Sequence, residues 1–122
     1  MTSRRSIVFD LDDTICSPIH TGATTEEKYG KALPNEQVIA GMHKLAEAGY
    51  HITIASSRRM LTHNGDIEKI LEDVGEITWQ WLEDHNVPYH ELIFGKPYSS
   101  TYYVDDKAMT PEMFCQNVDN ML

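Results

Sequence analysis

The 122-residue chain has few cysteines and no long apolar run. Its two cysteines, Cys16 and Cys115, lie far apart in sequence, and such a pair in a cytosolic chain is more often two free thiols than a disulfide. No segment approaches the roughly 18 consecutive apolar residues of a membrane helix, so we expect no membrane partner. The first six residues lack the apolar region of a secretory signal, which predicts a cytoplasmic protein.

Basic residues are also scarce. Ten lysines and arginines face 19 acidic residues, which gives a formal net charge of -9. Nucleic acids and anionic membranes repel such a chain at long range, so we expect neither as a general partner. A local basic site is still compatible with this charge. A site for a divalent cation must concentrate carboxylates, and a bound ion would neutralise part of the excess.

The hydrophobic pattern predicts alternating strands and helices in one domain spanning residues 1–122. Apolar or β-branched runs predict strands at 6–9, 51–55, 91–94 and 101–104. Helical spacing predicts helices from Pro34 to Gly49, over about 66–84 and from Thr110–Pro111 onward, and 15–33 reads as a flap-like loop containing Gly22. This alternation favours an α/β fold, a three-layer Rossmann-like parallel sheet with helices on both faces.

Polar clusters follow each predicted strand. Parallel sheets bind ligands beyond the carboxyl ends of their strands, so these clusters should meet at one edge. They are Asp10 to Thr14, Ser56 to Arg59, Gly95–Lys96 and Asp105–Asp106.

The residue types in these clusters suit phosphoryl transfer. Asp10 and Asp12 repel each other at one strand end unless a cation or a shared proton compensates. Oxygen donors without cysteine or histidine at metal spacing favour magnesium over zinc. The Lys96 ammonium and the Ser56 hydroxyl can stabilise charge on a phosphoryl group.

The motif Asp10-x-Asp12-x-Thr14, a hydroxyl after the second strand, a lysine after the third and an aspartate pair after the fourth resemble the haloacid dehalogenase superfamily. The resemblance covers essentially the whole chain and implies a core with strand order 4-1-2-3. An aspartate at position 12 is what the phosphatases of that superfamily show, whereas its dehalogenases lack it.

The resemblance implies a role for each matched residue. Asp10 would be the nucleophile that forms an aspartyl-phosphate, and Asp12 the general acid and base. Ser56 and Lys96 would bind the phosphoryl group, with Ser57 as an alternative hydroxyl and Arg58 as a further phosphate contact. Mg²⁺ would be held by four residues: Asp10, Asp12, Asp105 and Asp106.

The spacing of the motifs leaves no room for a cap domain. A capless site stays open, so it accepts a large substrate or is closed by a neighbouring subunit of a homo-oligomer. The stretches around Arg58, Pro88, Lys96 and Asp105 resemble small capless phosphatases of capsular polysaccharide biosynthesis, which implies a phosphorylated sugar or polyol, a small metabolite, as substrate.

Two other functions stay open. An open site admits polymers, so a nucleic-acid 3'-phosphatase is an alternative, although the charge of -9 disfavours it. A non-catalytic magnesium- or phosphate-binding module of a larger assembly is another. Of the six histidines, only His20 sits in the flap near the site, and Tyr98, just past Lys96, is a candidate for substrate contact.

Overall fold

The computed structural model describes residues 5–20 and 23–122 and shows a mixed α/β fold around a small parallel sheet. The sheet contains β1 (Ser6–Asp10), β4 (His51–Ser56) and β5 (Glu91–Phe94) in the order β1-β4-β5. Both neighbouring pairs are parallel, so all three strands end at the same edge. Three of the four predicted strands are confirmed. No helix in the described part of the chain is long and apolar enough to cross a membrane.

The core lies on one face of this sheet. Register pairs Phe9 with Ile54 and Ile54 with Leu92, so these side chains share that face. Helices α2 (Glu36–Glu47) and α5 (Pro111–Met121) are packed together there, and the Phe114 ring meets Phe9 edge-on at 5.0 Å. A Cβ at Gly41 of α2 would lie 2.6 Å from the Phe114 ring, so glycine permits the close approach of the two helices.

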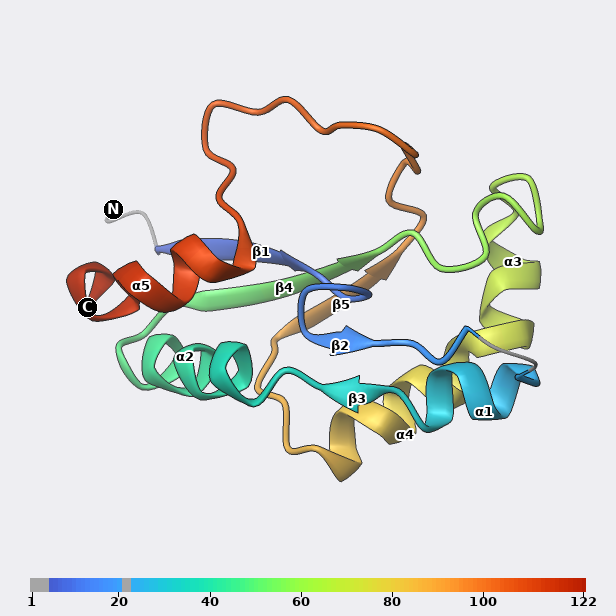
Figure 1. The fold of residues 1–122 in the computed structure, drawn as a ribbon, viewed down its shortest axis with the longest axis horizontal. Coiled ribbons are helices and arrows are strands. Elements are labelled where there is room, and N and C mark those ends of the chain that lie inside the picture. The colour runs from blue at the N-terminus through green and yellow to red at the C-terminus, as the bar shows by residue number, and fades with distance from the viewer. Residues whose placement is uncertain (1–4, 21–22) are drawn as a thin grey trace.

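The opposite face is more open. Val8 is 67% exposed and Ile93 is 49% exposed, although both lie in strands. Figure 1 shows α2 and α4 on one side of the sheet and the segment between β5 and α5 arching over the other. The structure therefore does not confirm helices on both faces.

The helical region between β4 and β5 has three parts. It consists of α3 (Ile67–Ile70), a π-helical turn (Leu71–Gly75) and α4 (Glu76–Asp84). The Asp66 side chain accepts a hydrogen bond from the Lys69 N–H and caps the start. The predicted helix over 66–84 is thus present, and Gly75 ends its π-helical turn.

The predicted flap is more ordered than expected. It contains β2 (Cys16–Ser17) paired antiparallel with β3 (Leu33–Pro34), and between them α1 (Thr25–Gly30). Thr24 and Glu27 form a capping box at the start of α1, each side chain accepting from the other's backbone N–H. Gly22, expected in this loop, lies outside the described residues.

The predicted fourth strand, 101–104, is wrong. The whole segment from 101 to 110 is exposed and extends no sheet, and Val104 is 98% exposed. Local hydrogen bonds hold the chain instead. The Tyr103 hydroxyl donates to the Pro97 carbonyl at 2.6 Å, and the Asp105 carboxylate accepts from the Lys107 N–H at 2.9 Å. Side chains that bond nearby backbone compete with strand pairing in this way.

Candidate active site

The chain turns sharply just after β1. The Leu11 carbonyl accepts from the Ile15 N–H at 2.9 Å, and Asp13 adopts a left-handed φ of 63° that aspartate tolerates better than most residues. The turn leaves Asp10 and Asp12 on the wall of a pocket of about 480 Å³. The pocket lies at the carboxyl end of the sheet, where the sequence predicted a site.

Lys96 follows β5, at the other edge of the sheet from β1, and its side chain extends to Asp10. Its Nζ lies 3.5 Å from Asp10 Oδ2. Gly95 places it there: the Gly95 and Lys96 N–H groups both donate to the Ser56 carbonyl at 3.1 Å, and Gly95 has a φ of 98°. Burial raises the pKa of the Asp10 carboxyl, while the Lys96 ammonium and the Leu11 N–H oppose that rise.

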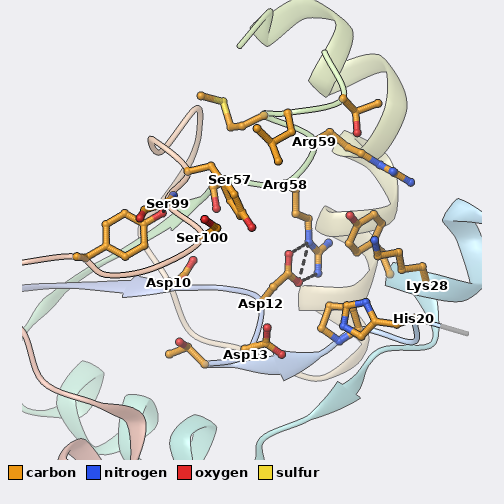
Figure 2. A pocket seen from close by; sticks show the side chains of 18 residues that line it. Asp10, Asp12, Asp13, His20, Lys28, Ser57, Arg58, Arg59, Ser99 and Ser100 are labelled. Carbon is orange, nitrogen blue, oxygen red and sulfur yellow. Dashed lines mark hydrogen bonds and ion pairs between the residues drawn. The ribbon is translucent and has the colours of Figure 1, made fainter. Parts of the chain in front are cut away.

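The partner of Asp12 is Arg58, whereas the partner of Asp10 is Lys96. Arg58 Nε donates to both Asp12 oxygens at 3.1 and 3.0 Å, and its Nη2 donates to Oδ1 at 2.8 Å. The Arg58 side chain has no exposed surface, and Figure 2 shows it meeting Asp12 at the centre of the pocket. The sequence predicted that Arg58 contacts phosphate, but the structure commits its guanidinium to Asp12.

The two serines of the second cluster have different surroundings. Ser56 is 1% exposed, and its hydroxyl accepts from the Arg58 N–H at 3.0 Å. Ser57 is partly exposed and lines the pocket, and Figure 2 draws it on the same side as Asp10. Ser57 therefore offers the more accessible hydroxyl of the pair.

The opposite wall of the pocket comes from the flap. His20 and Lys28 lie there, with Arg59 above them, and Tyr29 and Tyr98 also line the pocket. Arg59 donates to the Thr25 hydroxyl at 3.0 Å and is 3.3 Å from Asp73. His20 and Tyr98 stand where the sequence suggested. Lys28 and Tyr29 were missed because the flap was read as a loop, although Thr24-x-x-Glu27 is a capping-box signal.

The Asp105–Asp106 pair is not part of this pocket. Both residues are exposed, and neither lines it. Among residues 5–20 and 23–122, no three histidine, cysteine, aspartate or glutamate side chains gather closely enough to hold a metal ion. The four carboxylates predicted for magnesium are therefore not brought together.

With this geometry in view, comparison with known proteins shows similarity of fold. No family model matches the chain, and no curated protein matches it. A crystal structure of a target protein from Vibrio cholerae is 28% identical, with a TM-score of 0.82 over 96% of this chain and 95% of that one.

Two further solved structures are more distant. Chains of a Pnkp1/Rnl/Hen1 complex and of the Pnkp1/Rnl/Hen1 RNA repair complex are each 16% identical, with TM-scores of 0.55 and 0.54. The matches cover 97% and 99% of this chain but only 34% and 33% of those chains. This chain thus spans about a third of their length, and the likeness concerns fold alone.

The site combines chemically distinct groups. Asp10, a partly buried carboxylate, faces the Lys96 ammonium. Asp12, two residues after Asp10, is fixed by the Arg58 guanidinium. Hydroxyl groups of Ser57, Ser99 and Ser100 line the pocket beside them. Such a set can present a nucleophile, a proton-transferring acid and hydrogen-bond donors to one anionic substrate.

Proposed function

We propose that this chain is a phosphomonoester hydrolase with a haloacid dehalogenase-like core and with Asp10 as its nucleophile. The observation that carries the proposal is the contact between the Asp10 carboxylate, which lines an open pocket, and the Lys96 ammonium 3.5 Å away. The ammonium attracts a phosphoryl group to the carboxylate and stabilises charge on it. Along the chain, Asp10 and Asp12 come first, a serine hydroxyl follows and Lys96 comes after it, which is the order that the superfamily resemblance implies.

The proposed reaction has two halves. Asp10 attacks phosphorus, the bond from phosphorus to the ester oxygen breaks, and the Asp12 carboxylic acid gives its proton to the departing oxygen. Water then attacks the aspartyl-phosphate. The Asp12 carboxylate takes the proton from that water, the bond between phosphorus and the Asp10 oxygen breaks, and inorganic phosphate and free Asp10 result.

Magnesium remains a proposal drawn from the sequence. Asp10 and Asp12 already face the cations Lys96 and Arg58, and Asp105 and Asp106 lie outside the pocket. The residues as arranged do not form a magnesium site, and the two halves above use none. Assays with added Mg²⁺ and with a chelator test the proposed requirement directly.

For the substrate we propose the class that the sequence resemblance implies. We propose a phosphorylated sugar or polyol, a small metabolite whose hydroxyl groups can bond the serines and tyrosines around Asp10. A nucleic-acid 3'-phosphatase is the second candidate, because two solved structures of similar fold come from a complex, described in one case as an RNA repair complex. The net charge of -9 favours the small substrate.

The test is phosphate release from p-nitrophenyl phosphate, with and without Mg²⁺, by the wild-type chain and by Asp10→Asn and Asp12→Asn. We expect turnover by the wild type and its loss in Asp10→Asn. A folded wild-type chain that hydrolyses no phosphomonoester would rule out the enzyme. A panel of sugar phosphates, polyol phosphates and 3'-phosphorylated oligonucleotides then separates the two substrate classes.

A further inference from the structure

Arg58 is the most completely buried charged side chain at the site. Its side chain has no exposed surface, whereas 25% of the Asp12 side chain is exposed to the pocket. Every nitrogen of the guanidinium has a partner. Nε and Nη2 donate to Asp12, and Nη1 donates to the Thr78 hydroxyl at 2.8 Å. A fully engaged, buried guanidinium has one fixed orientation.

The surroundings of Arg58 reinforce that orientation. Nη2 also lies 3.5 Å from the Cys16 sulfur, and the Tyr29 ring stacks against the guanidinium at 4.3 Å. Thr78 is itself buried and donates to the Val74 carbonyl at 2.7 Å, so the acceptor for Nη1 is fixed by α4. Arg58 thus links Thr78 of α4 to the Asp12 carboxylate, so that the position of α4 fixes the position of that carboxylate.

The two oxygens of Asp12 are treated unequally. Oδ1 accepts from Arg58 Nε, from Arg58 Nη2 and from the Cys16 sulfur at 3.4 Å. Oδ2 accepts from Arg58 Nε alone among the described residues, at 3.0 Å. An oxygen already surrounded by three donors has little room for a proton, so a proton on Asp12 belongs on Oδ2.

We propose that Arg58 is a positioning residue for Asp12, anchoring Oδ1 so that Oδ2 exchanges protons with the substrate. This inference rests on the proposed function, in which Asp12 protonates the departing oxygen. It replaces the phosphate contact that the sequence suggested for Arg58. Proton transfer requires the acid to lie within hydrogen-bond reach of the reacting oxygen, so loosening Asp12 should slow that step selectively.

Two substrates that differ in their need for a proton on the leaving group test whether Arg58 acts through Asp12. The p-nitrophenolate ion leaves readily without a proton, whereas the alkoxide of glycerol phosphate needs one. We expect Arg58→Gln to lower kcat/KM about 100-fold on glycerol phosphate and less than about 10-fold on p-nitrophenyl phosphate, in line with typical general-acid contributions. Asp12→Asn should show the same selectivity, and Arg58→Gln should cost nothing further in that background.

Inorganic phosphate as an inhibitor distinguishes the two roles of Arg58. If Arg58 positions Asp12, the inhibition constant for phosphate should change less than about threefold in Arg58→Gln. A phosphate-binding Arg58 would instead weaken inhibition markedly and equally slow both esters. Equal losses on both esters, or weakened phosphate inhibition, overturn the proposal.

Thr78→Val provides a second test that keeps the Arg58 charge. It removes the Nη1 acceptor with little change in side-chain shape, and we expect a smaller but still selective loss on glycerol phosphate. This variant decides the matter if thermal unfolding shows that Arg58→Gln does not fold. An unaltered ratio of the two kcat/KM values would then contradict the proposal. A wild-type chain that hydrolyses neither ester would instead refute the proposed function.

Discussion

Lys96 Nζ lies 3.5 Å from Asp10 Oδ2 although Asp10 ends β1 and Lys96 follows β5, two strands that are not neighbours. β4 lies between β1 and β5, and the carbonyl of its last residue, Ser56, accepts from the Lys96 N–H. The contact therefore spans the width of the sheet. Its electrostatics lead to predictions for each partner.

Replacing Asp10 with asparagine should abolish activity and yet stabilise the fold. Burial raises the pKa of Asp10, so the ionised carboxylate is less favourable in the folded chain than in the unfolded one. Asparagine can still accept from the Leu11 N–H. We expect Asp10→Asn to raise the free energy of unfolding by about 0.5 to 1 kcal/mol at pH 7, as active-site replacements often do.

The pH dependence of that gain has a fixed sign. As pH rises from 3.8, the unfolded Asp10 loses its proton first and the folded one later, so the wild type loses stability over that window. The gain of Asp10→Asn should therefore shrink as pH falls toward 4 in thermal melts. Asp13→Asn is the control, because Asp13 is exposed and asparagine also tolerates its left-handed φ. An equal gain in Asp13→Asn would contradict this account.

Lys96→Ala should lose most of the activity and shift its acid limb. The Lys96 ammonium lowers the pKa of Asp10, so its removal lets that pKa rise further, and a larger share of Asp10 is protonated at a given pH. We expect kcat/KM to fall by about 100-fold or more and its acid limb to move to higher pH. Lys107→Ala, at an exposed lysine outside the pocket, should change neither quantity. Near wild-type rates in Lys96→Ala would show that Lys96 has no such role.

Strands and the order of site residues were predictable from sequence because they depend on local patterning. Apolar or β-branched runs at 51–55 and 91–94 form strands whose apolar side chains meet one core. Segment 101–104 is also rich in β-branched and aromatic residues and yet forms no strand. Its Tyr103 ring lies 4.4 Å from the Lys96 ammonium and its hydroxyl bonds Pro97, contacts that no strand propensity encodes.

The contact between Arg58 and Asp12 could not be predicted from the sequence, because it too depends on residues distant in the chain. From sequence, an arginine after a strand end is an exposed cation beside a phosphate site. Its burial depends on Thr78, which is 20 residues away and interrupts an otherwise apolar helical stripe. A polar residue at a buried helix position was the available signal, but only the packing of α4 against the flap shows which partner it serves.

The two cysteines should differ in reactivity. Burial raises the pKa of the Cys16 thiol to about 12, with Asp12 adding to the rise, and Cys16 is 1% exposed, whereas Cys115 is partly exposed. Burial and the nearby Glu112 carboxylate also raise the pKa of Cys115, but its partial exposure lets a thiol-specific reagent reach it in the folded chain. We expect such a reagent at pH 8 to modify Cys115 in the folded chain, well before Cys16, which should react only on unfolding, as peptide mass spectrometry would show. Cys115→Ser should abolish the fast phase. Rapid modification of Cys16 in the folded chain would contradict its burial.

The same shift predicts instability in alkali. Between pH 9 and about 12 the unfolded chain releases the Cys16 proton while the folded chain retains it, so stability falls as pH rises. Cys16→Ala removes this ionisation, although it leaves a small cavity. Its stability should therefore fall less steeply than that of the wild type above pH 9, measured by urea unfolding at each pH. Parallel slopes would show that Cys16 does not titrate differently in the two states.

Gly95→Ala tests how the backbone places Lys96. The φ of 98° is unfavourable for any residue with a Cβ, and the added atom would lie 2.6 Å from Ile67 Cδ1. We expect a loss of about 1 to 2 kcal/mol in stability together with a fall in kcat/KM, because a shifted residue 95 moves Lys96 away from Asp10. Gly49→Ala is the matched control: φ there is 93°, no atom of the described residues lies within 4 Å of the added Cβ, and Gly49 precedes β4 and does not line the pocket. It should lose stability through backbone strain yet retain full activity per folded molecule. Equal activity in both variants would mean that Lys96 reaches Asp10 without help from Gly95.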